Sequence, residues 1–189
     1  MRKCALFSVA LLAVLSFALP TQISAQSAFL GAGVTVPTGD YSDFGDGDGA
    51  NSGFMAIGGV TFPMGEGPLS IVGEGFYGMN NHEYEGDKTN LYGAMAGLLF
   101  DPSTEGEAGA YAFGQAGLMV HDYKSDDFSE FEGSETGFAF GGGVGYGFPL
   151  GSLSAWAEGR YMVGLFDDGN TTFAGIMAGL SFPLGGDGS

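Results

Sequence analysis

About eight segments of ten or so residues share one pattern, in which every second residue is apolar. A β-strand produces this period because its successive side chains point to opposite faces of a sheet. Beyond residue 25, no stretch keeps apolar residues at the i, i+3, i+4, i+7 spacing of a helix. Clusters of Gly, Asp, Asn, Ser and Pro separate the segments, which lie near residues 28–38, 53–63, 69–82, 90–100, 109–124, 136–148, 152–165 and 171–182. The chain is therefore expected to be all-β.

The connections between these segments alternate in character. Those after the first, third, fifth and seventh are acidic and span 40–52, 83–89, 125–135 and 167–170. The others are compact and contain Pro or Gly, at 63–68, 101–108 and 149–152. Long loops at one end and tight turns at the other are typical of an antiparallel up-and-down transmembrane β-barrel, here of eight strands. A soluble β-sandwich or lipocalin-like barrel is the alternative, but its water-facing strand positions would carry charges that these segments lack.

The N-terminus has the composition of a secretory signal peptide. Arg2 and Lys3 precede an apolar run from Ala5 to Leu19, and small residues follow up to Ala25. The run is shorter than the ~20 apolar residues that a membrane-spanning helix needs. We therefore expect a cleaved signal peptide over 1–25 and one barrel domain over 26–189. The only cysteine, Cys4, lies in the signal, so the mature chain has no disulfide, thiolate ligand or thiol nucleophile.

Charge and glycine content are both unusual. Cleavage removes two basic residues and no acid, so the formal net charge moves from −17 to −19. Such a surface repels phosphate backbones, and nucleic acid is not expected as a partner. The chain has 37 glycines. On one parity of the sixth segment, Ala139 is followed by four glycines, which we expect to leave space on one wall of the lumen: Gly141, Gly143, Gly145 and Gly147.

Phenylalanine recurs where the even-numbered segments end. Three of these segments end in Phe-Pro-x-Gly, and the other one ends in Phe-Asp-Pro. Proline is expected to end a strand because it has no N–H group to donate to the neighbouring strand. We expect a periplasmic aromatic girdle of Phe62, Phe100, Phe148 and Phe182. Counting back by two from each of these residues gives an uncharged, lipid-facing set. The other parity then faces the lumen.

A second repeat places polar side chains inside the barrel. By parity Glu74, Gln115 and Glu158 point into the lumen at similar heights, and Arg160 lies two residues beyond Glu158 on the same face. Charges facing lipid near the midplane are costly, so the inward position is favoured on energetic grounds too. These four side chains are expected to pair across the lumen and block it. The alternative, a general acid and base pair of Glu74 and Glu158, lacks a neighbouring nucleophile.

The whole mature chain resembles the OmpA/OmpX-like family of eight-stranded bacterial outer-membrane β-barrels. The resemblance rests on the signal, the eight-segment rhythm, the opening stretch from Gly31 to Asp40, and Glu158-Gly159-Arg160-Tyr161. It implies an integral outer-membrane location in a Gram-negative envelope. It also implies contact with outer-membrane lipid and lipopolysaccharide, and delivery by the outer-membrane insertion machinery. We expect a monomer.

Two weaker patterns concern metals and hydrolysis. His82 and His121 face the lumen mouth near Glu83, Glu85 and Asp122, a grouping that could bind a metal or support hydrolysis. The fourth segment separates them and no Ser or Asp pattern accompanies them, so solvated rim residues are the preferred interpretation. Asp46-Gly47-Asp48-Gly49 lacks the closing Glu of a calcium loop. The acidic loops are expected to be mainly a solvated rim, with loose binding of divalent cations as the alternative. No metal site and no cofactor is predicted.

Three functions follow from these patterns. The first is a non-enzymatic envelope protein with a structural or surface-interaction role and a lumen blocked by the polar cluster, since eight-stranded barrels are generally filled by side chains. The second is a conduit or binding barrel for small hydrophobic molecules. Its lining would be the inward residues Met55, Ile57, Leu91, Met95, Leu99, Met119, Phe173 and Met177. The third is a lipid-modifying enzyme, which would need His82 or His121 beside a Ser or a carboxylate.

Overall fold

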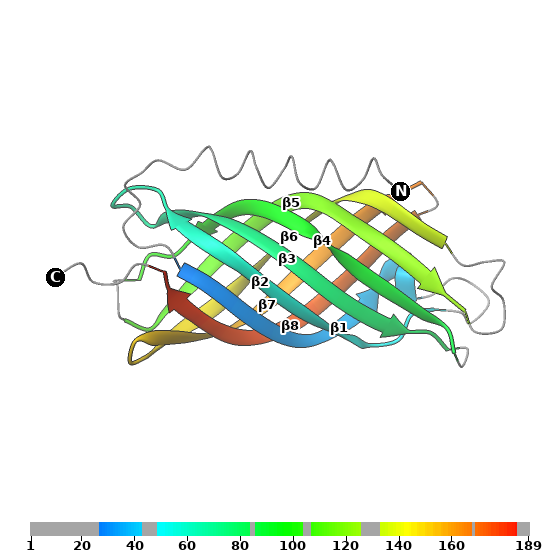
Figure 1. The fold of residues 1–189 in the computed structure, drawn as a ribbon, viewed down its shortest axis with the longest axis horizontal. Coiled ribbons are helices and arrows are strands. Elements are labelled where there is room, and N and C mark those ends of the chain that lie inside the picture. The colour runs from blue at the N-terminus through cyan, green and yellow to red at the C-terminus, as the bar shows by residue number, and fades with distance from the viewer. Residues whose placement is uncertain are drawn as a thin grey trace.

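Eight antiparallel strands close into one barrel in chain order (Figure 1). This computed structural model describes residues 27–42, 49–83, 86–103, 107–125, 133–167 and 169–184. The predicted signal peptide over 1–25 lies outside these residues. The strands are β1 (Ser27–Thr38), β2 (Gly53–Pro63), β3 (Leu69–Asn81), β4 (Lys88–Phe100), β5 (Gly109–Lys124), β6 (Gly133–Leu150), β7 (Leu153–Phe166) and β8 (Gly169–Pro183). The predicted eight-stranded up-and-down barrel is confirmed.

The barrel has a turn end and a loop end. β1 closes it by pairing with β8 from Ser27 opposite Pro183 to Thr38 opposite Thr172. The short connections after β2, β4 and β6 therefore lie beside the start of β1 and the end of β8. We call this the turn end, at the left of Figure 1, and the opposite end the loop end. A short 3-10 helix, η1 (Gly39–Ser42), follows β1 at the loop end. Among the described residues, no helix is long and apolar enough to cross a membrane.

Strand β6 is longer at both ends than the predicted 136–148. Pro149 pairs with Ser154 and Leu150 with Leu153, so Pro149 lies inside the strand and does not end it. The turn that follows needs only Gly151 and Ser152 because Gly151 adopts a positive φ of 65°. Gly65 has the same conformation, with φ of 75°, in the turn after β2. These two positions favour glycine because a Cβ is strained there.

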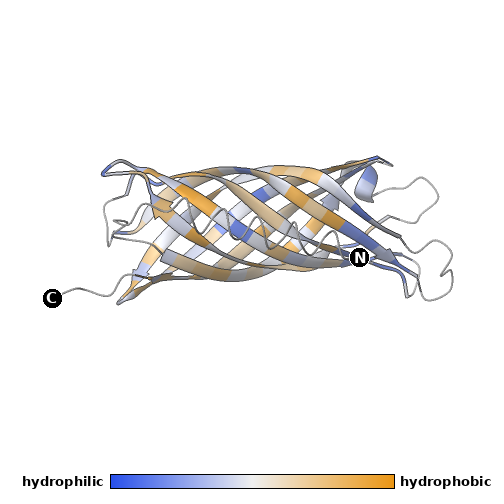
Figure 2. Cartoon of the chain, turned by 45° about the horizontal axis from the view of Figure 1, so that its top comes forward, coloured by the Kyte–Doolittle hydropathy of each residue, from blue (hydrophilic) through white to orange (hydrophobic). Residues whose placement is uncertain are grey.

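Exposure alternates along the strands with the predicted parity. The outward side chains are apolar or aromatic, and most of the strand surface is orange or pale in Figure 2, with blue at the strand ends of the loop end. Large outward residues include Leu30, Val34, Phe54, Ile71, Tyr77, Tyr92, Leu98, Leu118, Phe138, Phe140, Val144, Tyr161, Ile176 and Leu180. The outer wall is therefore an apolar belt. Such a surface is unfavourable in water and favourable against the hydrocarbon core of a membrane.

Aromatic rings cover many of the inward glycines. A Cβ added to Gly143 would lie 2.8 Å from the Phe113 ring, and one added to Gly145 would lie 2.3 Å from the Tyr111 ring. Trp156 lies in the same way against Gly31 and Gly179. The prediction that the β6 glycines leave space is thus wrong at Gly143 and Gly145, because rings from β5 fill it. It is also wrong at Gly141, where an added Cβ would lie 2.9 Å from Met162 Cγ. Gly147 does leave space: the nearest atom to its added Cβ is 4.0 Å away.

This packing predicts a large effect for one glycine substitution and almost none for another on the neighbouring strand. Gly145→Ala must displace the Tyr111 ring, and we expect it to lower the free energy of unfolding by about 1–3 kcal/mol, as overpacking does. Gly114→Ala, where an added Cβ has no atom within 4 Å, is the matched control. It should change stability by no more than about 0.5 kcal/mol. Urea unfolding in detergent micelles measures both, and equal effects would contradict the ring packing.

Candidate functional site

A cluster of charged side chains crosses the middle of the lumen. Arg160 donates from Nη1 to Glu74 Oε1 at 2.6 Å and from Nη2 to Glu74 Oε2 at 3.0 Å, a two-pronged pairing that matches guanidinium to carboxylate. Its Nε donates to Glu158 Oε1 at 2.8 Å, and Nη2 also donates to that oxygen. One guanidinium therefore holds both carboxylates.

The cluster joins opposite walls of the barrel. Glu74 is on β3 and Arg160 on β7, which are four strands apart in either direction around the closed sheet. The three charged side chains are only 2–6% exposed. These side chains are thus withdrawn from water. Ion pairing and hydrogen bonds must offset the hydration that they lose. With two carboxylates and one guanidinium, the cluster has a formal charge of −1.

The structure brings together three of the four predicted cluster residues. Gln115 is buried in the lumen, but within the described part of the chain no side-chain hydrogen bond joins it to Glu74, Glu158 or Arg160. Tyr111, which was not predicted to join the cluster, donates its hydroxyl to Glu158 Oε2 at 2.8 Å. Phe113 places its ring centroid 5.3 Å from the Arg160 Cζ atom. Both aromatic residues have the same strand parity as Gln115, and this parity could have predicted from the sequence that they point into the lumen.

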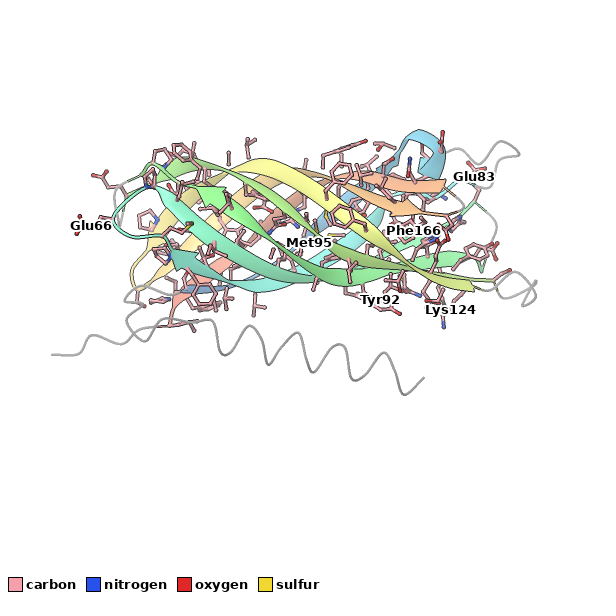
Figure 3. The ribbon with its side chains drawn as sticks, turned by 90° about the horizontal axis from the view of Figure 1, so that it is seen from above. Glu66, Glu83, Tyr92, Met95, Lys124 and Phe166 are labelled. Carbon is pink, nitrogen blue, oxygen red and sulfur yellow. The ribbon has the colours of Figure 1, made fainter. Side chains whose placement is uncertain are left out.

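Below the cluster, toward the turn end, lies a cavity of about 740 Å³. Glu74, Gln115, Glu158 and Arg160 line its inner end. Phe29, Ile57, Val72, Leu99, Phe113 and Trp156 line its walls, and residues of all three short turns surround its mouth. Figure 3 places Glu66, one of these turn residues, at the tip of the turn end. The lumen is thus hollow on this side of the cluster.

Toward the loop end, apolar side chains fill the lumen. Met162 is the next inward residue after Arg160, Met119 is the second inward residue after Gln115, and both methionines are fully buried. Figure 3 shows Met95 near the middle of the barrel. The buried residues of this half include Met55, Phe76, Leu91, Met95, Met119, Met162, Phe173 and Met177. Flexible methionines suit this irregular space because their side chains adapt to the gaps between other residues.

The loop end is closed by aromatic and polar residues. Tyr41 of η1 is fully buried, so this first loop folds into the mouth of the barrel. The Tyr41 ring meets the edge of His121 with 6.0 Å between centroids, and His121 lies 5.6 Å from the Phe166 ring. Burial raises the pKa of the Tyr41 hydroxyl above its ordinary value. His121 is therefore packed among aromatic rings and does not stand on a solvated rim as predicted.

His82 has different neighbours. Its Nε2 lies 2.8 Å from Thr89 Oγ1, and its ring meets Tyr123 edge-on at 5.3 Å. Tyr123 donates to Asp87 Oδ2 at 2.5 Å. This bond, and then a second from Ser125, hold the pKa of Asp87 below its ordinary value. Within the described ranges, no group of three or more His, Cys, Asp or Glu side chains is placed to hold a metal ion. The Asp46–Gly49 stretch lies outside these ranges.

The four predicted girdle residues lie near the turn end, on the outward parity. Phe100 and Phe148 are exposed, and Phe62 and Phe182 are partly buried. Phe148 packs against Tyr146 with 5.2 Å between ring centroids. Aromatic rings at this height are common where a barrel meets the lipid headgroups.

Comparison with known proteins agrees with this architecture. A family model described as the outer membrane protein beta-barrel domain matches residues 9–182. The chain belongs to this family. Its members are outer-membrane proteins, and this barrel is accordingly an outer-membrane protein. A search of curated proteins found no match.

Solved structures share the fold at low sequence identity. Neisserial surface protein A has a TM-score of 0.65 at 15% identity, over 83% of this chain and 96% of that one. Ail, the attachment invasion locus protein of Yersinia pestis, has a TM-score of 0.54 at 18% identity, over 85% of this chain and 100% of that one. A major outer membrane protein of Thermus thermophilus has a TM-score of 0.52 at 13% identity, over 86% and 100%. These likenesses establish the shared barrel alone.

Proposed function

We propose that this protein is a non-enzymatic envelope component whose barrel does not conduct solutes. The observation behind the proposal is the paired contact of Arg160 with Glu74 across the lumen, with Glu158 on the same guanidinium. A charged bridge between opposite walls occupies the centre of the path along the barrel axis. The methionine-rich half above it adds a second, apolar obstruction.

The residues around the two histidines favour a structural role over catalysis. Thr89, the hydroxyl nearest to His82, is 0% exposed, so no substrate can reach it without the mouth opening. His121 contacts the rings of Tyr41 and Phe166. Phenylalanine has no nucleophilic group, and burial raises the pKa of the Tyr41 hydroxyl, which disfavours its deprotonated, nucleophilic form. A hydrolase needs a nucleophile and a base within reach of a bound substrate.

The outer wall suggests lipid as the main partner. The apolar belt would contact acyl chains, and the acidic loop end would face outward beside lipopolysaccharide, since short turns of such barrels face the periplasm. The charged residues at outward positions of the described strands, Lys88, Asp122 and Lys124, all lie at the loop end. The belt itself therefore carries no charge that would pair two copies. We therefore propose a monomer, inserted by the outer-membrane assembly machinery, with a structural or surface-interaction role.

Conductance in planar lipid bilayers tests the closed lumen. Because the bridge and the methionines block the axis, the refolded protein should give no discrete current steps under conditions where a wide-lumen porin, used as the control, gives them. Steps of constant size that scale with the amount of protein would contradict the proposal and favour a conduit.

A further inference from the structure

The cavity at the turn end is closed at its inner end, and the residues that the structure describes leave its mouth open. Its volume of about 740 Å³ lies in the range of sites that hold a small organic molecule. The charged cluster forms its inner end, and the buried methionines lie beyond that. A molecule that enters from the turn end therefore meets the side chains of Glu74, Glu158 and Arg160 and can go no further.

The charge of this cavity is strongly negative. Among the described residues that line it, Arg160 is the only basic one, whereas Glu66, Glu74, Asp101, Glu107 and Glu158 are acidic. After residue 3, the other basic residues of the chain are Lys88 and Lys124. They lie opposite each other in the register of β4 and β5, at the loop end. Figure 3 shows Lys124 at that end, far from Glu66. Among the described residues there is thus no second cation near the cluster to offset its charge of −1.

The aromatic walls of the cavity suit a ligand that carries an apolar group next to a positive charge. Phe29 and Trp156 meet edge to face with 6.3 Å between centroids, and both line the cavity. The π faces of aromatic rings attract cations, and tryptophan does so most strongly. Arg160 itself lies over the Phe113 ring, so this lumen already stabilises one cation in that way.

From these observations we propose that the turn-end cavity is a binding site for an organic cation with an aromatic or aliphatic body. The cationic group lies toward Glu74, Glu158 and the carboxamide of Gln115, and the body packs against Phe29 and Trp156. The bound ligand offsets the charge that Arg160 leaves uncompensated. This inference rests on the proposed closed lumen, because the cluster forms the inner end of the site.

Trp156 is the only tryptophan in the chain, so its fluorescence reports on the cavity. The refolded protein in nonionic micelles would be titrated with trimethyl(3-phenylpropyl)ammonium. The controls are its uncharged isostere, in which tert-butyl replaces trimethylammonium, and 3-phenylpropanesulfonate. We expect a saturable change with the cation, at a half-saturation concentration at least about tenfold below that of the isostere, and none with the sulfonate. Equal affinity for the cation and the isostere would overturn the proposal, as would a cation response that does not saturate.

Two substitutions change the charge of the inner end in opposite directions. Glu74→Gln makes the cluster neutral and should weaken cation binding about tenfold, whereas Gln115→Glu should strengthen it. Asp122→Asn, at a partly exposed ion pair with Lys124 near the loop end, is the control and should have no effect. If Glu74→Gln does not fold, the Gln115→Glu variant and the isostere comparison still decide. Unchanged binding in both charge variants would contradict the assigned site.

Conductance with the same cation as the charge carrier separates this inference from the proposed function. Binding without current supports both. Current together with saturable binding overturns the closed lumen, and with it the closed inner end of the site, but supports cation binding in the cavity. The absence of both binding and current overturns only the site.

Discussion

Replacing Arg160 with methionine is expected to lower the free energy of unfolding by about 3–5 kcal/mol, the range for removing one partner of a buried ion pair. The variant leaves Glu74 and Glu158 buried across from each other, without the guanidinium that now donates four hydrogen bonds to them. Urea unfolding of the refolded protein in micelles, followed by circular dichroism, measures this loss.

Two further variants identify the cause of the stability loss in Arg160→Met. Arg160→Lys keeps the positive charge but cannot form the two-pronged pairing, so its loss should lie between wild type and Arg160→Met. Replacing all three charges, as Glu74→Gln, Glu158→Gln and Arg160→Met together, removes the unpaired carboxylates and should recover much of the stability. If Arg160→Met unfolds at the same urea concentration as wild type, the cluster does not hold the two walls together.

The second large effect concerns the outer wall. Val144 is 66% exposed and lies between Phe140 and Phe148 on the outward parity of β6, near the middle of the belt. Val144→Arg places a charge in the hydrocarbon, and we expect a loss of about 2–4 kcal/mol in lipid bilayers. Unfolding by denaturant in bilayers measures it.

Met64→Arg is the matched control for this substitution. Met64 is also exposed, but it lies in the turn after β2, where an arginine reaches water and should cost no more than about 1 kcal/mol. Small, equal losses for both variants would mean that Val144 does not face lipid.

Local pattern was enough to predict most of the fold. The period-two alternation, the prolines near the strand ends and the acidic loops are properties of neighbouring residues, so the strands and their inward parity followed from the chain itself. Strand β6 shows where this stops. Pro149 looked like an end signal, but the pairing with Ser154 across a two-residue turn extended the strand past it.

The lumen was predictable in parity but not in partners. Parity placed Glu74, Gln115, Glu158 and Arg160 inside, whereas which of them touch depends on strand tilt and on closure of the sheet. Closure put β3 opposite β7, and within the described residues it left Gln115 without a side-chain bond to the charged residues. The rings of Tyr111 and Phe113 had no local sign of their positions against Gly145 and Gly143, because those contacts join different strands.

By itself, then, the sequence determined an outward apolar belt, an inward polar set, and a chain with one basic residue available to the lumen. Tertiary structure alone decided that Arg160 bridges both carboxylates, that rings fill the glycine wall, that Tyr41 enters the mouth, and that a cavity remains at the turn end. The physical reason is the separation along the chain of the residues that interact. Alternation is set by each strand's own geometry, but contacts across a lumen exist only after the last strand has paired with the first.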